Sequence, residues 1–291
     1  MMAFRSSSRQ GGQAAVETAI VLPLHLFLLL GILQWGLIAH ARSLAKYAAY
    51  RAVRVGAMQH ADPDKMKQAA ILALLTIIAQ PNSGFTGGEN ILPTRNATEV
   101  VSKLGRVWAM NALAKGTLGR PIVNVVVCGP LRQDVAGSAQ TAVGSGVGDA
   151  REVDFDDPRV ATEGFDGSGN ANSGDPNYGN FIRTKLRIQV QFLYRMPIPF
   201  ANWILSYAYL GMQLPEIMRM GTAKGALVTR SALKGQKRAL FDAMLLANQA
   251  RIYFAPINVN YSMRMQSDFY LAGKTDLPRQ NNCFHYLPAG G

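Results

Sequence analysis

A run of 24 residues, from Thr18 to Ala41, contains no Asp, Glu, Lys or Arg. As a helix it would be about 36 Å long, which is enough to cross a hydrocarbon core of about 30 Å. Buried helices of soluble proteins rarely continue so far without a charge, and the apolar region of a cleaved secretory signal is shorter. We therefore expect a transmembrane helix, in which Pro23 and Gly31 are tolerated and take part in packing. Trp35 lies toward its outer end, where an indole suits the lipid–water interface.

A carboxylate, Glu17, stands at the very start of this apolar run. A carboxylate there is costly in lipid unless it finds a partner. If the chain were cut after Gly12, Gln13 would become the first residue and Glu17 the fifth. The carboxylate could then pair with the new amino terminus of a neighbouring helix.

These residues resemble the class III signal of type IV pilin-like proteins. Such a signal has a short basic leader, which here carries Arg5 and Arg9, then a Gly before the cut and a Glu at the fifth mature position. The resemblance implies that a prepilin peptidase removes residues 1–12 on the cytoplasmic side and leaves the apolar helix intact. It also implies that such helices pack into a filament or an assembly platform.

The first 58 residues also resemble the TadE-like family of tight-adherence (Tad, Flp) pilus proteins. The similarity lies in the Gly-x-x-x-x-Glu start, the Leu22-Pro23 step inside the helix, and the Ala/Arg-rich stretch from Ala41 to Ala57. Membership would imply a structural minor pilin or pseudopilin of a Tad-type pilus or secretion apparatus, with no catalysis of its own and no cofactor. Its partners would be other pilins, their inner-membrane platform, the prepilin peptidase and membrane lipid.

The charges that flank the apolar run bear on topology. Arg5 and Arg9 precede it, and four bases follow it: Arg42, Lys46, Arg51 and Arg54. A simple count would place the carboxyl side in the cytoplasm. We nevertheless expect the amino end to be cytoplasmic, because prepilin processing requires this and because the later bases can snorkel from a projecting helix. The expected organisation is a leader (1–12), a transmembrane helix with its extension (13–60) and a periplasmic domain (61–291), on a single-pass protein of the inner membrane.

The composition narrows the remaining possibilities. The chain of 291 residues is 48% apolar and only 16% charged, which excludes overall disorder. Its net charge of +12 suits an anionic partner. Among such partners the amino terminus favours a membrane over nucleic acid. An alternative function is therefore a membrane-anchored domain that binds an anionic ligand, a lipid surface or an acidic protein without any role in a filament.

Patterns after residue 60 predict an α+β domain with antiparallel strands. Asp62-Pro63 is typical of a helix start, and Asn96 with Glu99 resembles a capping box that opens another helix. Strands are predicted for residues 121–128, 185–194 and 257–265, the second half-buried because its apolar residues alternate with polar ones. A helix is also expected at 239–253.

A further helical stripe allows two interpretations. It comprises Phe200, Trp203, Ile204, Tyr207 and Leu210. Such a stripe more often faces a protein core, but Trp and Tyr are also favoured in a helix that lies in the membrane interface.

Two segments carry opposite charge. A Gly-rich insertion, 144–180, has a net charge of −6, and we expect it to be exposed. Residues 217–241 contain six bases and no acid. Such a run of charge is usually a face exposed to solvent. We hypothesise that the two segments bind each other, within or between subunits. The six bases, which are also candidate contacts for another anionic partner, are Arg219, Lys224, Arg230, Lys234, Lys237 and Arg238.

Catalytic patterns are missing from the sequence. It holds no His-Glu-x-x-His and no Gly-x-Ser-x-Gly, and we predict neither a catalytic residue nor a metal site. Cys128 and Cys283 are 155 residues apart, and in an oxidising periplasm they could form a disulfide. Two separate thiols are the alternative, because the sequence does not give the Cα separation on which a disulfide depends.

Overall fold

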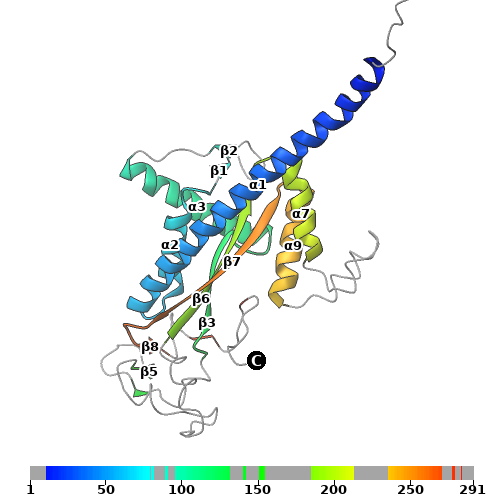
Figure 1. The fold of residues 1–291 in the computed structure, drawn as a ribbon. Coiled ribbons are helices and arrows are strands. Elements are labelled where there is room, and N and C mark those ends of the chain that lie inside the picture. Colours follow the sequence, from blue (N-terminus) through cyan, green and yellow to red (C-terminus); the bar gives the residue numbers. More distant parts are fainter. Residues whose placement is uncertain are drawn as a thin grey trace, which may run out of the picture.

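The first helix, α1 (Gly11–Met58), is continuous over 48 residues in the computed structural model. Figure 1 shows that its second half crosses the domain and its first half projects beyond it. This confirms the prediction that the apolar helix continues into the Ala/Arg-rich stretch. The structure describes residues 11–78, 80–81, 89–90, 96–131, 140–141, 151–154, 185–212, 235–270, 277–278 and 283.

A three-stranded antiparallel sheet forms the centre of the domain. Its order is β3 (Val123–Gly129), β6 (Lys185–Arg195) and β7 (Phe254–Arg264), with β6 in the middle. Val125 pairs with Val190, which pairs in turn with Val259, so the apolar residues of all three strands share one face. The predicted α+β class and antiparallel sheet are confirmed. All three predicted strands are present, although β7 begins three residues before the expected Ile257.

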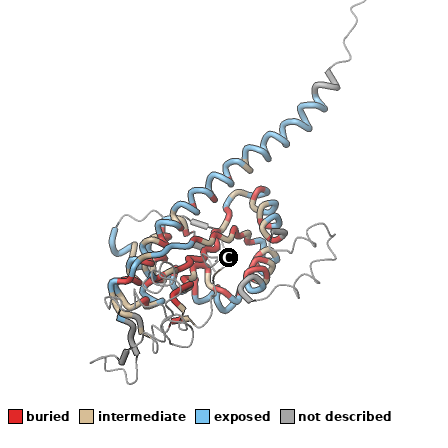
Figure 2. The backbone as a smooth tube through the Cα atoms, turned by 60° about the horizontal axis from the view of Figure 1, so that its bottom comes forward, coloured by how far each residue is buried: buried red, intermediate tan, exposed pale blue. Residues whose placement is uncertain are grey.

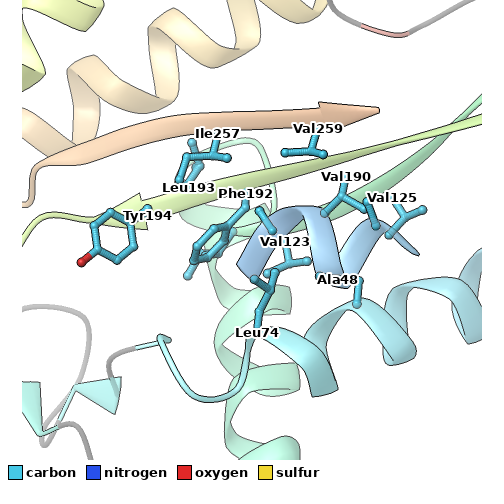
Figure 3. Packing of buried hydrophobic residues seen from close by; sticks show 14 of the residues in the cluster. Ala48, Leu74, Val123, Val125, Val190, Phe192, Leu193, Tyr194, Ile257 and Val259 are labelled. Carbon is cyan, nitrogen blue, oxygen red and sulfur yellow. The ribbon is translucent and has the colours of Figure 1, made fainter. Parts of the chain in front are cut away.

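The inner half of α1 and the helix α2 (Pro63–Leu74) cover this apolar face. Small side chains of α1 recur every three or four residues, and this lets the helix approach the sheet closely. Figure 3 shows Ala48 and Leu74 packed with Val123, Val125 and Val190. The buried small residues of α1 are Ala41, Ala45, Ala48, Ala49, Ala52 and Ala57.

The other face of the sheet is polar but also covered. Gln189 and Gln191 of β6 are 1% and 2% exposed, so the expectation of a half-buried strand was wrong. The amides satisfy one another: Gln191 donates to Gln189 at 3.0 Å, and Gln189 donates to Asn260 of β7 at 2.7 Å. Arg120 donates to Gln191 at 2.9 Å. The alternation predicted the strand, but it could not show that a polar face would be covered and bonded internally.

Two helix starts were read from local residues. Asp62 caps α2 by accepting from the backbone N–H of Asp64 at 2.9 Å and of Lys65 at 3.4 Å, as expected. Helix α3 (Ala97–Thr117) also begins where expected. Its predicted capping box is wrong, however, since the Asn96 side chain forms no capping hydrogen bond.

Two helices, α7 (Ala201–Met212) and α9 (Gly235–Gln249), connect β6 to β7. They pack against each other, and Ser206 of α7 donates to Asn248 of α9 at 2.9 Å. Helix α9 begins and ends four residues earlier than the expected 239–253. Arg251 follows it with a positive φ of 58°, and this turns the chain into β7.

Short strands complete the described part of the chain. β1 (Gln80–Pro81) pairs with β2 (Glu89–Asn90). β5 (Arg151–Val153) pairs with both β4 (Gln140–Thr141) and β8 (Phe269–Tyr270). β5 belongs to the acidic segment 144–180. The structure describes only β5 and the exposed Asp154 of this segment.

Candidate functional site: the projecting half of α1 and its junction with the domain

The first half of α1 makes almost no contact with the rest of the described chain. Its apolar window has a mean hydropathy of 2.2 and none of it is buried. Figure 2 shows the exposed half as a continuous pale-blue stretch, and the burial of α1 begins only where it meets the domain. By length and composition this is the one helix in the described structure that can cross a membrane. Because a soluble core helix would be buried, the exposure favours a single-pass membrane anchor.

The predicted processing residues lie at the tip of this projecting helix. Gly12 and Gln13 already have helical backbone, since α1 begins at Gly11. Glu17 follows one helical turn after Gln13, and its side chain is exposed. The structure thus leaves the Glu17 carboxylate open to a partner outside the chain, as the proposed pairing requires.

Pro23 and Gly31 lie within the same exposed segment. Pro23 is accommodated inside α1, which continues through it without a break in the helix. A shallow groove next to it is lined by small and apolar side chains, those of Ala15, Thr18, Ala19, Leu22 and Pro23. A Cβ built on Gly31 would meet no atom within 4 Å. Small residues on a membrane helix let a second helix approach closely, so this surface is suited to helix packing.

The junction between α1 and the domain was not predicted. Gln34 is the first fully buried residue of α1, and its Oε1 accepts from the backbone N–H of Ile198 at 3.1 Å. Two helical turns earlier, the ring of Phe27 meets that of Phe200 edge-to-face at 5.7 Å between centroids. Gln34 could have been noticed as a polar residue inside the apolar run, since such residues need a partner. No local signal identifies Ile198, which lies 164 residues further along the chain.

A disulfide joins the two cysteines. Cys128 lies near the end of β3 and Cys283 in the carboxyl-terminal segment, with their Cα atoms 5.6 Å apart. Of the two readings left open by the sequence, the structure therefore has the bonded one. Disulfides persist mainly in oxidising compartments.

Four of the six bases in the predicted basic segment fall outside the described residues. The four are Arg219, Lys224, Arg230 and Lys234. Lys237 has helical backbone in α9, and the exposed Arg238 lies 4.0 Å from Asp242, one turn further on. The pairing of this segment with the acidic insertion therefore remains a hypothesis.

Two buried bases lie elsewhere in the domain. Burial lowers the pKa of Arg120 to about 10, so the guanidinium that bonds Gln191 keeps its charge at neutral pH. Burial also lowers the pKa of Lys103 on α3. The described residues contain no group of His, Cys, Asp or Glu that could hold a metal ion. We assign a structural role to Arg120, since it belongs to the polar network of the sheet.

Comparison with protein families agrees with the geometry of α1. Residues 12–54 match the family described as TadE-like protein. No curated protein and no solved structure is significantly similar to the chain. The matched residues comprise the exposed apolar half of α1 and most of its packed, Ala-rich half. The resemblance of the amino-terminal segment to the TadE-like family is thereby confirmed over residues 12–54.

Proposed function

We propose that the protein is a minor pilin or pseudopilin of a Tad-type pilus or secretion apparatus, and that its role is structural. The exposed apolar half of α1, inside the TadE-like match, carries the proposal. It is continuous with a half that is built into the domain core, so a force or a register set in the membrane is passed to the domain through one rigid helix. The Cys128–Cys283 disulfide supports a periplasmic domain, and hence an inner-membrane anchor with a cytoplasmic amino end.

In this mechanism Glu17 sets register. After cleavage behind Gly12, the carboxylate of Glu17 pairs with the amino terminus of a neighbouring pilin in the apolar bundle. A buried polar pair of this kind favours one alignment over others, because every other alignment leaves a charge without a partner in lipid. The groove beside Pro23 receives the neighbouring helix. The partners are other pilins and their inner-membrane platform.

Intact mass of the protein from its native membrane tests the processing step. We expect the wild-type mass to lack residues 1–12, and Gly12→Leu to retain them, because a bulky side chain before the cut blocks the peptidase. Gly31→Leu is the matched control, since a side chain there meets nothing within 4 Å, and it should be processed normally. A wild-type protein that keeps its first twelve residues would contradict the proposal and favour the anchored domain with an anionic ligand.

Assembly tests the role of Glu17. We expect Glu17→Gln to be inserted and processed normally, but to lower its incorporation into sheared surface filaments by about tenfold or more, because the amide cannot form the ion pair in lipid. Asp64→Asn removes the same charge from an exposed position on α2, outside the span, and should leave incorporation unchanged. Equal incorporation of Glu17→Gln and wild type would exclude the pairing.

A further inference from the structure

Helix α7 presents an apolar face that no described part of the chain covers. Phe200, Trp203, Ile204 and Tyr207 are 59%, 52%, 55% and 53% exposed. Trp203 and Tyr207 pack against each other edge-to-face at 5.9 Å. Of the predicted stripe only Leu210 is buried, so the expectation of a core-facing stripe was wrong. The opposite side of α7, with Ala201 and Ser206, packs into the domain.

The position of this face is fixed relative to the membrane helix. Phe200 contacts Phe27 of α1. A hydrocarbon core of about 30 Å takes about 20 helical residues, which reach Leu30 when counted from Gly11 and Gly36 when counted from Glu17. Either count places Phe27 inside the apolar layer. Phe200 must therefore lie at the level of lipid, and Figure 1 shows α7 starting beside α1 where that helix leaves the domain.

The backbone at the start of α7 is suited to lipid. A helix start in water can leave its first N–H groups to solvent, but lipid offers them no acceptor. Here Asn202 donates from its backbone to Ile198 at 3.0 Å, Trp203 to the Asn202 side chain at 2.7 Å, and Ile204 to Phe200 at 3.2 Å. Ile198 itself donates to Gln34, and its neighbours Pro197 and Pro199 have no N–H.

The backbone of Phe200 adopts a strained conformation. Its φ is +65°, in the left-handed region that a bulky residue rarely occupies. Such a conformation persists only where the surrounding structure holds it. It brings the Phe200 ring against Phe27, and the ring is still more than half exposed beside the apolar helix. The exposed apolar surfaces of α1 and α7 are thereby joined.

We propose that the amino-terminal end of α7 enters the outer leaflet of the bilayer as a second membrane contact. Phe200 and Ile204 reach the acyl chains, and Trp203 and Tyr207 occupy the interface, where amphipathic rings are favoured. Residues 196–212 contain no charged side chain. This absence of charge is needed for contact with lipid. The contact fixes the domain against the membrane surface in addition to the single α1 tether. The proposal rests on α1 crossing the bilayer and on the proposed periplasmic side of the domain, and it does not depend on processing or on filament assembly.

Three single-tryptophan variants of the full chain test this insertion, since the protein has only Trp35, Trp108 and Trp203. Each retains one Trp, with Phe at the other two positions. The probe is a nanodisc of phosphatidylcholine and phosphatidylglycerol, loaded with one chain and containing lipids brominated near the glycerol end of the acyl chain. Trp108 is the matched control, because it lies on α3 under the Lys67 ammonium, 5.0 Å from the ring centroid.

We expect bromine to quench Trp35 and Trp203 by about twofold or more, and Trp108 hardly at all, because only the first two lie at interface depth. Quenching of Trp35 without Trp203 would overturn the α7 proposal and leave the α1 anchor standing. No quenching of either would overturn the anchor as well. A Tyr207→Trp variant lacking the native tryptophans gives a second reading of the same face, and it too should be quenched. If Trp203 is protected only in nanodiscs that hold two chains, a second copy covers the face and the lipid proposal fails.

Discussion

Removal of the Cys128–Cys283 disulfide is expected to lower the free energy of unfolding by about 4–5 kcal/mol, since the chain-entropy model predicts this for so long a loop. The two residues are 155 positions apart, and the closed loop contains β6, α7, α9 and β7. Opening the loop gives the unfolded chain more conformations, while the folded sheet retains its other contacts. An effect of this size is a large part of the stability of an ordinary domain.

The measurement is a urea titration of the full chain in detergent micelles, for wild type and for Cys128→Ala/Cys283→Ala. Alanine is chosen because Cys128 is 2% exposed and a serine there would bury a hydroxyl. A thiol reductant should shift the wild-type midpoint to that of the double variant and leave the variant unchanged. Coincident midpoints for oxidised and reduced wild type would contradict the prediction.

The disulfide also shows where sequence reasoning reached its limit. The spacing of the cysteines in the sequence predicts how much a disulfide between them would stabilise the fold. It does not predict whether the two cysteines lie close enough to form one. That distance depends on where β3 ends and on how the carboxyl-terminal segment returns to it. Neither of these follows from a local pattern. The same limit applies to Gln34 and Ile198, whose contact depends on the path of the chain through the whole sheet.

Local patterns succeeded where one residue type decides the structure. The absence of charge from Thr18 to Ala41 predicted one long apolar helix, and this helix is continuous and its apolar half is exposed, as a membrane anchor requires. Asp62-Pro63 predicted the start of α2, because an aspartate cap and a fixed proline φ both suit that position. Alternation predicted β6 and β7, whose apolar residues face α1.

Sequence patterns failed to predict what covers a given face of a helix or strand. The stripe on α7 has the spacing of a core-facing helix, yet four of its five residues are exposed beside the membrane helix. An apolar face buried in protein and one buried in lipid have the same periodicity, so our proposal of lipid contact rests on the position of Phe200 next to Phe27. Gln189 and Gln191 show the reverse case, in which polar residues predicted to be exposed are buried in a network of side-chain amides.

A side chain at Gly56 is expected to be the most damaging single change in α1. A Cβ there would lie 2.7 Å from Leu186 Cδ2 and 2.9 Å from Met66 Cγ, and it would also collide with Met66 Sδ. Leu186 of β6 and Met66 of α2 are both fully buried, so neither can move into open space. Gly56→Leu should therefore cost about 3 kcal/mol or more, at the upper end of overpacking effects.

Gly105→Leu provides the matched control, because Gly105 lies inside helix α3 with nothing within 4 Å of its Cβ position. There the substitution should stabilise by about 0.5–1 kcal/mol, since glycine is a poor helix former. Opposite shifts of the urea midpoint for the two variants would establish that close packing, and not helix propensity, decides the effect at Gly56. Destabilisation of both by the same amount would contradict this.

The position of Gly56 gives the prediction a functional consequence. The TadE-like match ends at residue 54, just before the three-way contact of α1, α2 and β6 at Gly56. Gly56→Leu leaves Gly12, Glu17 and the apolar half of α1 unchanged, so membrane insertion and removal of residues 1–12 should proceed normally. A loosened junction should instead free the domain from the packed half of α1, which increased proteolysis between α1 and α2 would show. If the loosened variant is processed normally but is incorporated less into filaments, assembly requires the rigid coupling of the membrane helix to the domain. If its incorporation is unchanged, the helix assembles without that coupling.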